Sequence, residues 1–368
     1  MRFRPTLGSS AVVATVAMAI VLAAATSVQA RVPKGFFGIV PQTPITAEDT
    51  NRMHHGGVET IRLPLSWAQV QPSPMLPFFW SDFDRVVTAA AQSNIDVLPV
   101  LEGVPRWLVR KPTRLPVDSG VQRRGWAAFV GAAVERYGPR GQFWQEHWAG
   151  SGDFVPPHPI TQWQVWNEPN FHFFTTPASP SRYAQLLRIS SRAIKAVYGR
   201  ADVIMGGLFG DPKGRPPQSM DATQFLDRLY GSRGIKGSFD GVALHPYAAD
   251  VRTLGRLARQ VRGVMLRHGD RRTGLYITEI GWGSKHNPRR VAFEIGLRPQ
   301  ARELGRAYSL LIRERRSLNL KQVDWFTWKD VQGSCGFCDS TGLFRRGERF
   351  RPKPAWHTFS AVAHGRLR

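Results

Sequence analysis

Residues Phe83–Leu101 read FDRVVTAAAQSNIDVLPVL, in which a helix-forming segment is followed within a few residues by an apolar strand. The alanine-rich part, Phe83–Gln92, favours a helix, while Ile95–Leu101 is rich in Val, Ile and Leu and favours a strand. Another apolar run, Thr60–Pro64 (TIRLP), precedes the helix. Two apolar strands joined by a helix predict a strand–helix–strand unit with parallel, buried strands.

The same alternation continues along most of the chain. The predicted strands are Phe36–Val40, Thr60–Pro64, Ile95–Leu101, Trp163–Trp166, Val203–Met205, Val242–Leu244, Leu275–Thr278 and Val323–Thr327. Helical segments lie between them, such as Ser181–Tyr198 and Arg252–Arg267, whose apolar residues recur at helical spacing. About eight strand–helix pairs predict a single α/β domain, a (β/α)8 or TIM barrel. An open doubly wound sheet is the alternative, but no glycine-rich phosphate loop follows the first strand.

The N-terminal segment Met1–Ala30 has the pattern of a secretory signal. Arg2 and Arg4 precede an uncharged run, Ala11–Ala25, and a Ser-Val-Gln-Ala sequence then places small residues at the usual cleavage positions. We predict a signal peptide over 1–30, cleaved after Ala30, and a catalytic barrel domain over 31–368 that is secreted or held in the cell envelope. An uncleaved membrane anchor is the alternative. No other run is long and apolar enough for a membrane span.

The composition is strongly basic. Lys and Arg number 50 against 27 Asp and Glu, a formal net charge of +23, and two of these charges lie in the predicted signal peptide. This balance favours contact with anionic surfaces such as acidic glycans, cell envelopes or nucleic acid. The basic residues are scattered and no nucleic-acid-binding motif is present, so nucleic acid is not the expected partner. Hydrophobic residues make up 42% of the chain, which is enough for a large core and excludes a disordered protein.

Polar residues follow several predicted strands at their C-terminal ends, where a (β/α)8 barrel carries its active site. They are Arg62, Glu102, Asn167, Glu168, His245, Tyr247, Glu279 and the segment Trp325–Asp330. Carboxylates at such positions are costly unless they are paired or used in chemistry. Two carboxylates across one pocket are what the cleavage of a glycosidic bond needs. The sequence therefore indicates Glu168 and Glu279 as a catalytic pair.

These residues resemble the motifs of clan A glycoside hydrolases. Trp166–Asn170 (WNEPN) looks like the strand-four motif of that clan, and Ile277–Trp282 (ITEIGW) looks like its strand-seven motif. His245–Tyr247 (HPY) is similar to the strand-six motif, and Arg62 to the strand-two arginine. The resemblance is greatest to bacterial members of families 39 and 5, and it covers nearly all of residues 36–363. It implies a (β/α)8 enzyme that hydrolyses glycosidic bonds with retention of configuration.

The resemblance implies roles for the individual residues. Glu279 would be the nucleophile, kept ionised by Arg62 and Tyr247 through a lowered pKa. Glu168 would protonate the leaving oxygen and then activate water. Asn167 would bind the sugar's 2-hydroxyl group.

Other positions have more than one interpretation. Glu102 stands where many family 5 members carry His, and it either contacts a sugar subsite or forms a structural salt bridge. Trp325 and Trp328 are both candidates for the ring that stacks on the sugar at the cleavage site. His245 either supports the pocket or is a hydrogen-bonded core histidine, and Arg62 could equally be part of a core ion pair.

Cys335 and Cys338 form a Cys-x-x-Cys motif after the last strand. A signal peptide implies an oxidising compartment, so we predict a disulfide rather than redox or zinc chemistry. Two thiols alone cannot complete a zinc site, and no metal or cofactor is predicted.

The predicted activity is that of a secreted retaining O-glycosyl hydrolase. Its expected partner is an oligosaccharide or polysaccharide, anionic ones included, bound by a monomer that does not span the membrane. One alternative is a carbohydrate-binding barrel without activity, against which the presence of both glutamates argues. The other is a basic interaction protein of the cell envelope.

Overall fold

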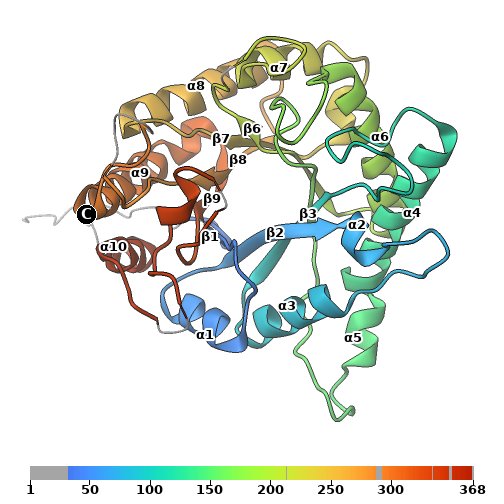
Figure 1. Ribbon diagram of the computed structural model, residues 1–368, viewed down its shortest axis with the longest axis horizontal. Coiled ribbons are helices and arrows are strands. Elements are labelled where there is room, and N and C mark those ends of the chain that lie inside the picture. The colour runs from blue at the N-terminus through green and yellow to red at the C-terminus, as the bar shows by residue number, and fades with distance from the viewer. Residues whose placement is uncertain (1–31, 213, 287–291, 334, 348–349, 367–368) are drawn as a thin grey trace, which may run out of the picture. The chain divides into compact units, whose positions relative to one another are not determined.

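The computed structural model describes residues 32–212, 214–286, 292–333, 335–347 and 350–366, so the predicted signal peptide lies outside the described residues. Parallel strands form a central barrel, with helices in a ring around it (Figure 1). The strands are β1 (Phe37–Val40), β2 (Thr60–Ser66), β3 (Asp96–Glu102), β4 (Gln162–Val165), β5 (Asp202–Met205), β6 (Leu208–Phe209), β7 (Gly241–His245), β8 (Gly274–Ile280) and β9 (Leu320–Phe326).

The sheet closes on itself through strand pairs that are far apart in sequence. β9 pairs with β1, and β5 pairs with β7 where Ile204 lies opposite Gly241. β6 follows β5 after two glycines and also pairs with β7, so β5 and β6 together occupy one position in the ring. The ring therefore has eight strand positions. The predicted (β/α)8 barrel is confirmed, and the open doubly wound sheet is wrong.

Four of the helices begin after a side chain that accepts a hydrogen bond from the first turn, at Thr46, Ser119, Ser179 and Asp250. Thr46 and Asp49 form a capping box before α1, and Asp250 caps α8 by accepting from Thr253 N. The helices are α1 (Ala47–His55), α2 (Trp67–Val70), α3 (Ser81–Gln92), α4 (Gly120–Tyr137), α5 (Gln142–Glu146), α6 (Pro180–Val197), α7 (Ala222–Tyr230), α8 (Val251–Arg267), α9 (Leu297–Leu318) and α10 (Pro354–Ala363). Among the described residues, none of these helices is long and apolar enough to cross a membrane.

The barrel interior contains polar side chains as well as an apolar layer. Asp324 on β9 is fully buried, and both of its carboxylate oxygens accept hydrogen bonds from Gln322 Nε2, at 2.8 and 3.0 Å. A Cβ at Gly38 on the neighbouring β1 would lie 1.8 Å from Asp324 Oδ1, so only glycine leaves room for this carboxyl group. Burial raises the pKa of Asp324 to about 7. An ionisable group thus lies inside the barrel, where Arg62 and Glu279 act on it electrostatically.

Candidate active site

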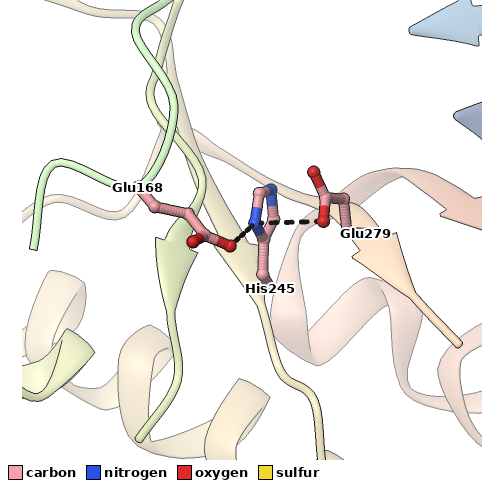
Figure 2. A group of neighbouring side chains, drawn as sticks. All are labelled: Glu168, His245 and Glu279. Atoms are coloured by element: carbon pink, nitrogen blue, oxygen red, sulfur yellow. Dashed lines mark hydrogen bonds and ion pairs between the residues drawn. The ribbon is translucent and has the colours of Figure 1, made fainter. Parts of the chain in front are cut away.

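Two glutamates lie at the C-terminal ends of barrel strands. Glu168 follows β4, Glu279 is the next-to-last residue of β8, and they are only 4% and 7% exposed. His245 stands between them, and one side-chain atom from each of the three residues lies within 4.8 Å of the other two (Figure 2). Retaining glycosidases space their carboxyl groups about 5–5.5 Å apart, and inverting ones about 6.5–9.5 Å. Here one carboxylate oxygen of Glu168 lies within 4.8 Å of one carboxylate oxygen of Glu279.

Arg62 connects three residues of the site. Its Nη1 donates to Glu279 Oε1 at 2.7 Å, its Nη2 to Asn167 Oδ1 at 2.7 Å, and its Nε to Gln164 Oε1 at 2.6 Å. Because β2 continues to Ser66, Arg62 lies in the middle of its strand, and its predicted position at the strand end is wrong. Since the Asn167 carbonyl is engaged by Arg62, the amide NH2 group of Asn167 is the part that can donate to a ligand.

Glu279 has a donor on each of its two carboxylate oxygens. Besides the Arg62 contact, Tyr247 Oη donates to Glu279 Oε2 at 2.8 Å. The sequence did not lead us to Gln164. This residue of β4 accepts a hydrogen bond from Arg62 Nε and so helps to hold the guanidinium in place. A polar residue inside the predicted strand Trp163–Trp166, whose other residues are apolar, was the signal that could have found it.

His245 is the last residue of β7 and is fully buried. Its Nδ1 lies 2.7 Å from Glu168 Oε1 and 3.6 Å from Glu279 Oε2, and its Nε2 lies 3.0 Å from Thr278 Oγ1. A Cβ at Gly207 would lie 2.0 Å from His245 Nε2, so the glycine between β5 and β6 makes room for the imidazole ring. His245 therefore belongs to the site and contacts both glutamates.

The backbone around Glu168 is unusual. Trp166 and Glu168 have φ angles of 69° and 40°, in the left-handed region that non-glycine residues seldom adopt. Trp166 Nε1 donates to Thr175 Oγ1 at 2.8 Å, and the Asn170 side chain exchanges hydrogen bonds with the backbone of Phe209 and Met220. Strained conformations of this kind persist where the surroundings hold them, and they are common at functional sites. Here they place the Glu168 side chain beside His245.

The two glutamates differ in how easily they ionise. Burial, and then the charge of Glu279, raise the pKa of Glu168 well above its usual range. Burial also raises the pKa of Glu279, although Arg62 and Tyr247 lower it. The prediction that the pKa of Glu279 is lowered is therefore wrong, because the effect of burial outweighs the effects of Arg62 and Tyr247. Burial lowers the pKa of His245 well below its usual range, so this imidazole is neutral. The arrangement favours a protonated Glu168 beside a Glu279 whose charge is stabilised.

Glu102 ends β3 near the same charges. Burial raises its pKa to about 7, against the charge of Arg62. Within the described part of the chain no ion pair is formed by Glu102, which argues against the salt-bridge interpretation.

The two tryptophans predicted to bind sugar do not face the site. Trp325 and Trp328 are both fully buried. Trp325 Nε1 donates to Thr341 O at 3.0 Å, and Trp328 Nε1 donates to Asp49 Oδ1 at 2.7 Å. Side chains alternate between the two faces of a strand, so Trp325 and its neighbour Phe326 point in opposite directions. It is Phe326 that lies against Tyr247, at 6.2 Å between ring centroids. The predicted sugar contacts of Trp325 and Trp328 are wrong.

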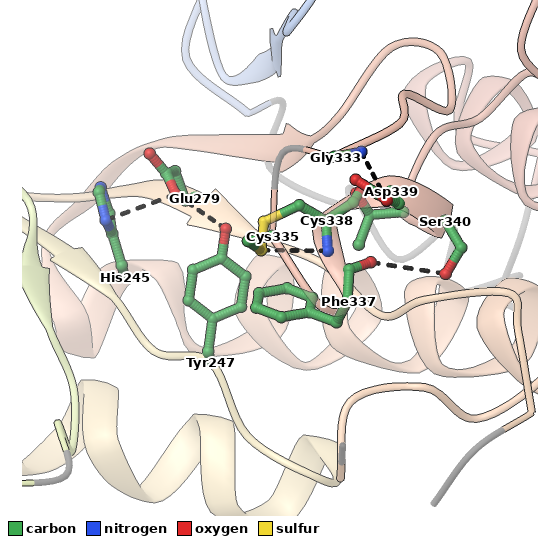
Figure 3. The surroundings of a disulfide bond; sticks show 10 residues. His245, Tyr247, Glu279, Gly333, Cys335, Phe337, Cys338, Asp339 and Ser340 are labelled. Carbon is green, nitrogen blue, oxygen red and sulfur yellow. Dashed lines mark hydrogen bonds and ion pairs between the residues drawn. A yellow bond between two sulfur atoms is a disulfide. The ribbon is translucent and has the colours of Figure 1, made fainter. Parts of the chain in front are cut away.

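Cys335 and Cys338 form a disulfide beside the site (Figure 3). Cys338 is buried in a cluster that includes Tyr247, and the ring of Phe337 lies 5.1 Å from the ring of Tyr247. The disulfide thus closes the turn in which Phe337 packs against Tyr247, and Tyr247 in turn donates a hydrogen bond to Glu279.

The glutamates and His245 are also the one group of described side chains that could surround a metal ion. Their contacts favour proton chemistry instead. The guanidinium of Arg62 lies 2.7 Å from Glu279 Oε1, and a cation there would face its positive charge. The Tyr247 hydroxyl occupies the other oxygen of Glu279.

A cavity of about 340 Å³ lies at the opposite, N-terminal end of the barrel. Its lining includes Asp96 and Asp202. Asp96 pairs with His158, and Asp202 accepts from Gln162 Nε2 at 3.3 Å. Since these carboxylates already have partners, the cavity is a weaker candidate for catalysis.

Comparison with solved structures finds the same barrel in several glycoside hydrolases. A family 39 glycoside hydrolase from the gut symbiont Bacteroides cellulosilyticus WH2 has a TM-score of 0.64 and 21% identity, over 90% of this chain and 64% of that one. A monomeric β-xylosidase from Caulobacter crescentus CB15 has a TM-score of 0.64 and 17% identity, over 90% and 68%. A GH5_18 protein from Bifidobacterium longum, in complex with Manβ1-4GlcNAc, has a TM-score of 0.64 and 14% identity, over 90% and 78%.

The fold is that of clan A glycoside hydrolases. The chain spans about two thirds of the length of the two family 39-like structures, 64% and 68%. No protein-family model and no curated protein matches the chain. At such low identity the structural neighbours establish the barrel, and the argument for an activity depends on the residues within it.

Proposed function

We propose that the protein is a secreted retaining glycoside hydrolase. The observation that carries this proposal is the unequal pair of buried glutamates within 4.8 Å of a shared histidine. Glu279 has Arg62 and Tyr247 to stabilise its negative charge, as a nucleophile requires. Glu168 has a raised pKa, as a general acid requires.

The reaction takes two steps. Glu279 attacks the anomeric carbon while the bond to the leaving oxygen breaks, and Glu168 gives its proton to that oxygen. This forms a covalent glycosyl ester on Glu279. Once the negative charge of Glu279 is lost, Glu168 has a lower pKa and can take a proton from water. The resulting hydroxide attacks the anomeric carbon and releases Glu279, so configuration is retained after two inversions.

Asn167 and Glu102 supply contacts to the sugar in this proposal. With its carbonyl bound to Arg62, Asn167 directs its NH2 group to the sugar's 2-hydroxyl, an interaction that strengthens in the transition state. Glu102 stands at the end of β3 as a half-buried hydrogen-bonding group for the same sugar.

The substrate is a β-glycoside in this proposal, as the structural neighbour named a β-xylosidase suggests. The test is a screen of aryl β-glycosides and polysaccharides, with product configuration followed by NMR. Release of the β-anomer first supports retention. Release of the α-anomer first would show an inverting enzyme and overturn the retaining mechanism. No turnover of any substrate would overturn the enzyme proposal and favour a binding barrel.

Secretion is a separate proposal that depends on Met1–Ala30. The mature chain is expected to begin at Arg31, because the small residues before it fit a signal-peptidase site. N-terminal sequencing of the exported protein checks this. A chain that begins at Met1 and stays in the membrane fraction would contradict it.

A basic surface on α8 and α9 favours an anionic polysaccharide or envelope as the place of action. These two helices pack against each other and carry Glu303 and Glu314 as their only acidic residues. Their exposed arginines are Arg252, Arg256, Arg259 and Arg267 on α8, and Arg298, Arg302, Arg306, Arg313 and Arg316 on α9. The spacing places each set mainly on the outer side of its helix.

Binding to an acidic polysaccharide is therefore expected to weaken as salt rises, because exposed charges are screened. The double variant Arg256→Gln, Arg313→Gln is expected to bind about 10- to 30-fold more weakly at low salt, at roughly 1 kcal/mol per charge. The control is Arg85→Gln, Arg192→Gln, which removes two exposed arginines from other helices. Equal losses in both variants would show that only net charge matters and that α8 and α9 form no specific surface.

A further inference from the structure

A chain of phenylalanine rings runs beside the candidate catalytic glutamates, and the proposed reaction uses none of them. Phe173 packs on Phe171 at 4.9 Å between ring centroids, and Phe171 packs on Phe209 at 4.8 Å. Phe209 stacks on Tyr247 at 5.8 Å. Around Tyr247 lie the rings of Phe293, Phe326 and Phe337, at 6.1, 6.2 and 5.1 Å, and Figure 3 shows the contact of Phe337. We call these six phenylalanines the phenylalanine band.

The band starts next to the candidate acid. Phe171 N donates to Glu168 O at 3.0 Å, so the chain turns directly after Glu168 and brings Phe171 and Phe173 beside it. The polar groups that would hold the cleaved sugar, Asn167 and Glu102, come from the residues after β4 and from the end of β3. A general acid must lie next to the leaving oxygen, so the group that departs extends past Glu168. Phe171 and Phe173 are therefore placed to contact the leaving group.

These rings are partly open to solvent. Phe173 is 67% exposed, and Phe171 and Phe209 are half-buried. A phenylalanine ring has no polar atom, so these rings offer a ligand apolar contact and no hydrogen bond. An exposed cluster of apolar rings beside a reactive site indicates an apolar ligand.

The polar side chains of the same loop are already engaged in holding it. Asn170 Nδ2 donates to Phe209 O at 2.8 Å and to Met220 O at 2.7 Å, and Asn170 Oδ1 accepts from Phe209 N at 3.0 Å. His172 Nδ1 lies 2.9 Å from Ser219 Oγ. These contacts fix Phe171 and Phe209 in place and occupy both N–H donors of the Asn170 side chain.

We propose that the leaving-group subsite takes an apolar aglycone, aryl or alkyl, in place of a second sugar. The inference rests on the proposed glycosidase function and names the class of its substrate. The rings would stabilise such an aglycone by burying its apolar surface. The resulting binding free energy grows with each CH2 group that is buried.

The test uses xylosyl, glucosyl and mannosyl β-fluorides together with the matching methyl β-glycosides, octyl β-glycosides and β-1,4-linked disaccharides. A glycosyl fluoride has no aglycone and reports the catalytic pair alone. Methanol, octanol and a sugar hydroxyl are all poor leaving groups, so differences among their glycosides report the subsite. The octyl glycoside is expected to have a kcat/KM at least about tenfold above that of the methyl glycoside and that of the disaccharide. The burial of a few CH2 groups could supply a larger factor than this.

The matched variants are Phe173→Ser and Phe154→Ser. Phe154 is 47% exposed and lies in the segment between α5 and β4, outside the band. The ratio of kcat/KM for the octyl glycoside to that for the fluoride is expected to fall about tenfold in Phe173→Ser and to keep its wild-type value in Phe154→Ser.

The outcomes separate the two proposals. If no fluoride is cleaved and the wider screen of β-glycosides also finds no substrate, the glycosidase function itself is wrong. If a fluoride is cleaved but the disaccharide is preferred to the octyl glycoside, the function stands and the apolar subsite is overturned. An equal fall of the ratio in both variants would also overturn the subsite, because the effect would not depend on the band.

Discussion

Replacing Glu279 with alanine is expected to lower kcat/KM by about 10⁴- to 10⁶-fold, the size of loss seen when an enzyme loses its nucleophile. The reason is that Arg62 and Tyr247 are arranged around this carboxylate and can stabilise no covalent intermediate without it. Azide is small enough to enter the space left by the side chain. Added azide is expected to restore turnover of an activated β-glycoside and to give the α-glycosyl azide, which NMR identifies.

Two further variants make this result interpretable. Glu279→Gln keeps a side chain of the same shape against Arg62, so a similar loss there shows that the charge, not the packing, is needed. Glu314→Ala removes an acidic residue on α9 that pairs with Arg259 at 2.9 Å, and it is expected to keep wild-type kcat/KM. If Glu279→Ala remains near wild type on every substrate that the wild type cleaves, Glu279 is not the nucleophile.

Replacing Glu168 with alanine is expected to have an effect that depends on the leaving group. General acid catalysis contributes about 10²- to 10⁴-fold, and a good leaving group needs little of it. The kcat/KM of an alkyl glycoside is therefore expected to fall by about 10²- to 10⁴-fold, while that of a dinitrophenyl glycoside stays within about tenfold of wild type. Comparison of the two substrates in both enzymes measures this difference.

The pH profile gives an independent measurement of the same residue. In the wild type, activity requires Glu168 protonated and Glu279 ionised, so kcat/KM rises with pH as Glu279 loses its proton and falls as Glu168 does. Because the pKa of Glu168 is raised above that of an ordinary glutamate, the falling limb lies well above the usual carboxyl range. In Glu168→Ala this limb is expected to disappear for the dinitrophenyl glycoside. A falling limb at the same pH in the variant would show that another group is the acid.

The barrel could be predicted from the sequence because its signals are local. Apolar strands such as Ile95–Leu101 and amphipathic helices such as Arg252–Arg267 show their periodicity within a few turns, and both appear in the structure close to their predicted positions. The short motifs around Glu168 and Glu279 likewise contain their chemistry within a few residues. The structure brings these two residues together, as strand order in a barrel requires.

Several site residues could not be predicted, because they depend on strand register. Trp325 and Phe326 are neighbours in sequence, and only the face that each presents decides that Trp325 is buried outside the sheet and Phe326 contacts Tyr247. Arg62 takes part in the site from mid-strand because Gln164 on β4 and Asn167 just after it, across β3 in the sheet, accept its hydrogen bonds.

The sequence by itself determined the order of strands and helices, the barrel they form, and the pair of glutamates at two of its strand ends, because each follows from residues close together in the chain. The tertiary structure alone decided how those glutamates ionise and what lies beside them. Burial raises the pKa of Glu279 against the opposing effects of Arg62 on β2 and of Tyr247, which follows β7. The phenylalanine band is assembled from loops after β4, β8 and β9 and from strand residues on β6 and β9. Interactions between residues so far apart depend on distances in the folded chain, which no local pattern contains.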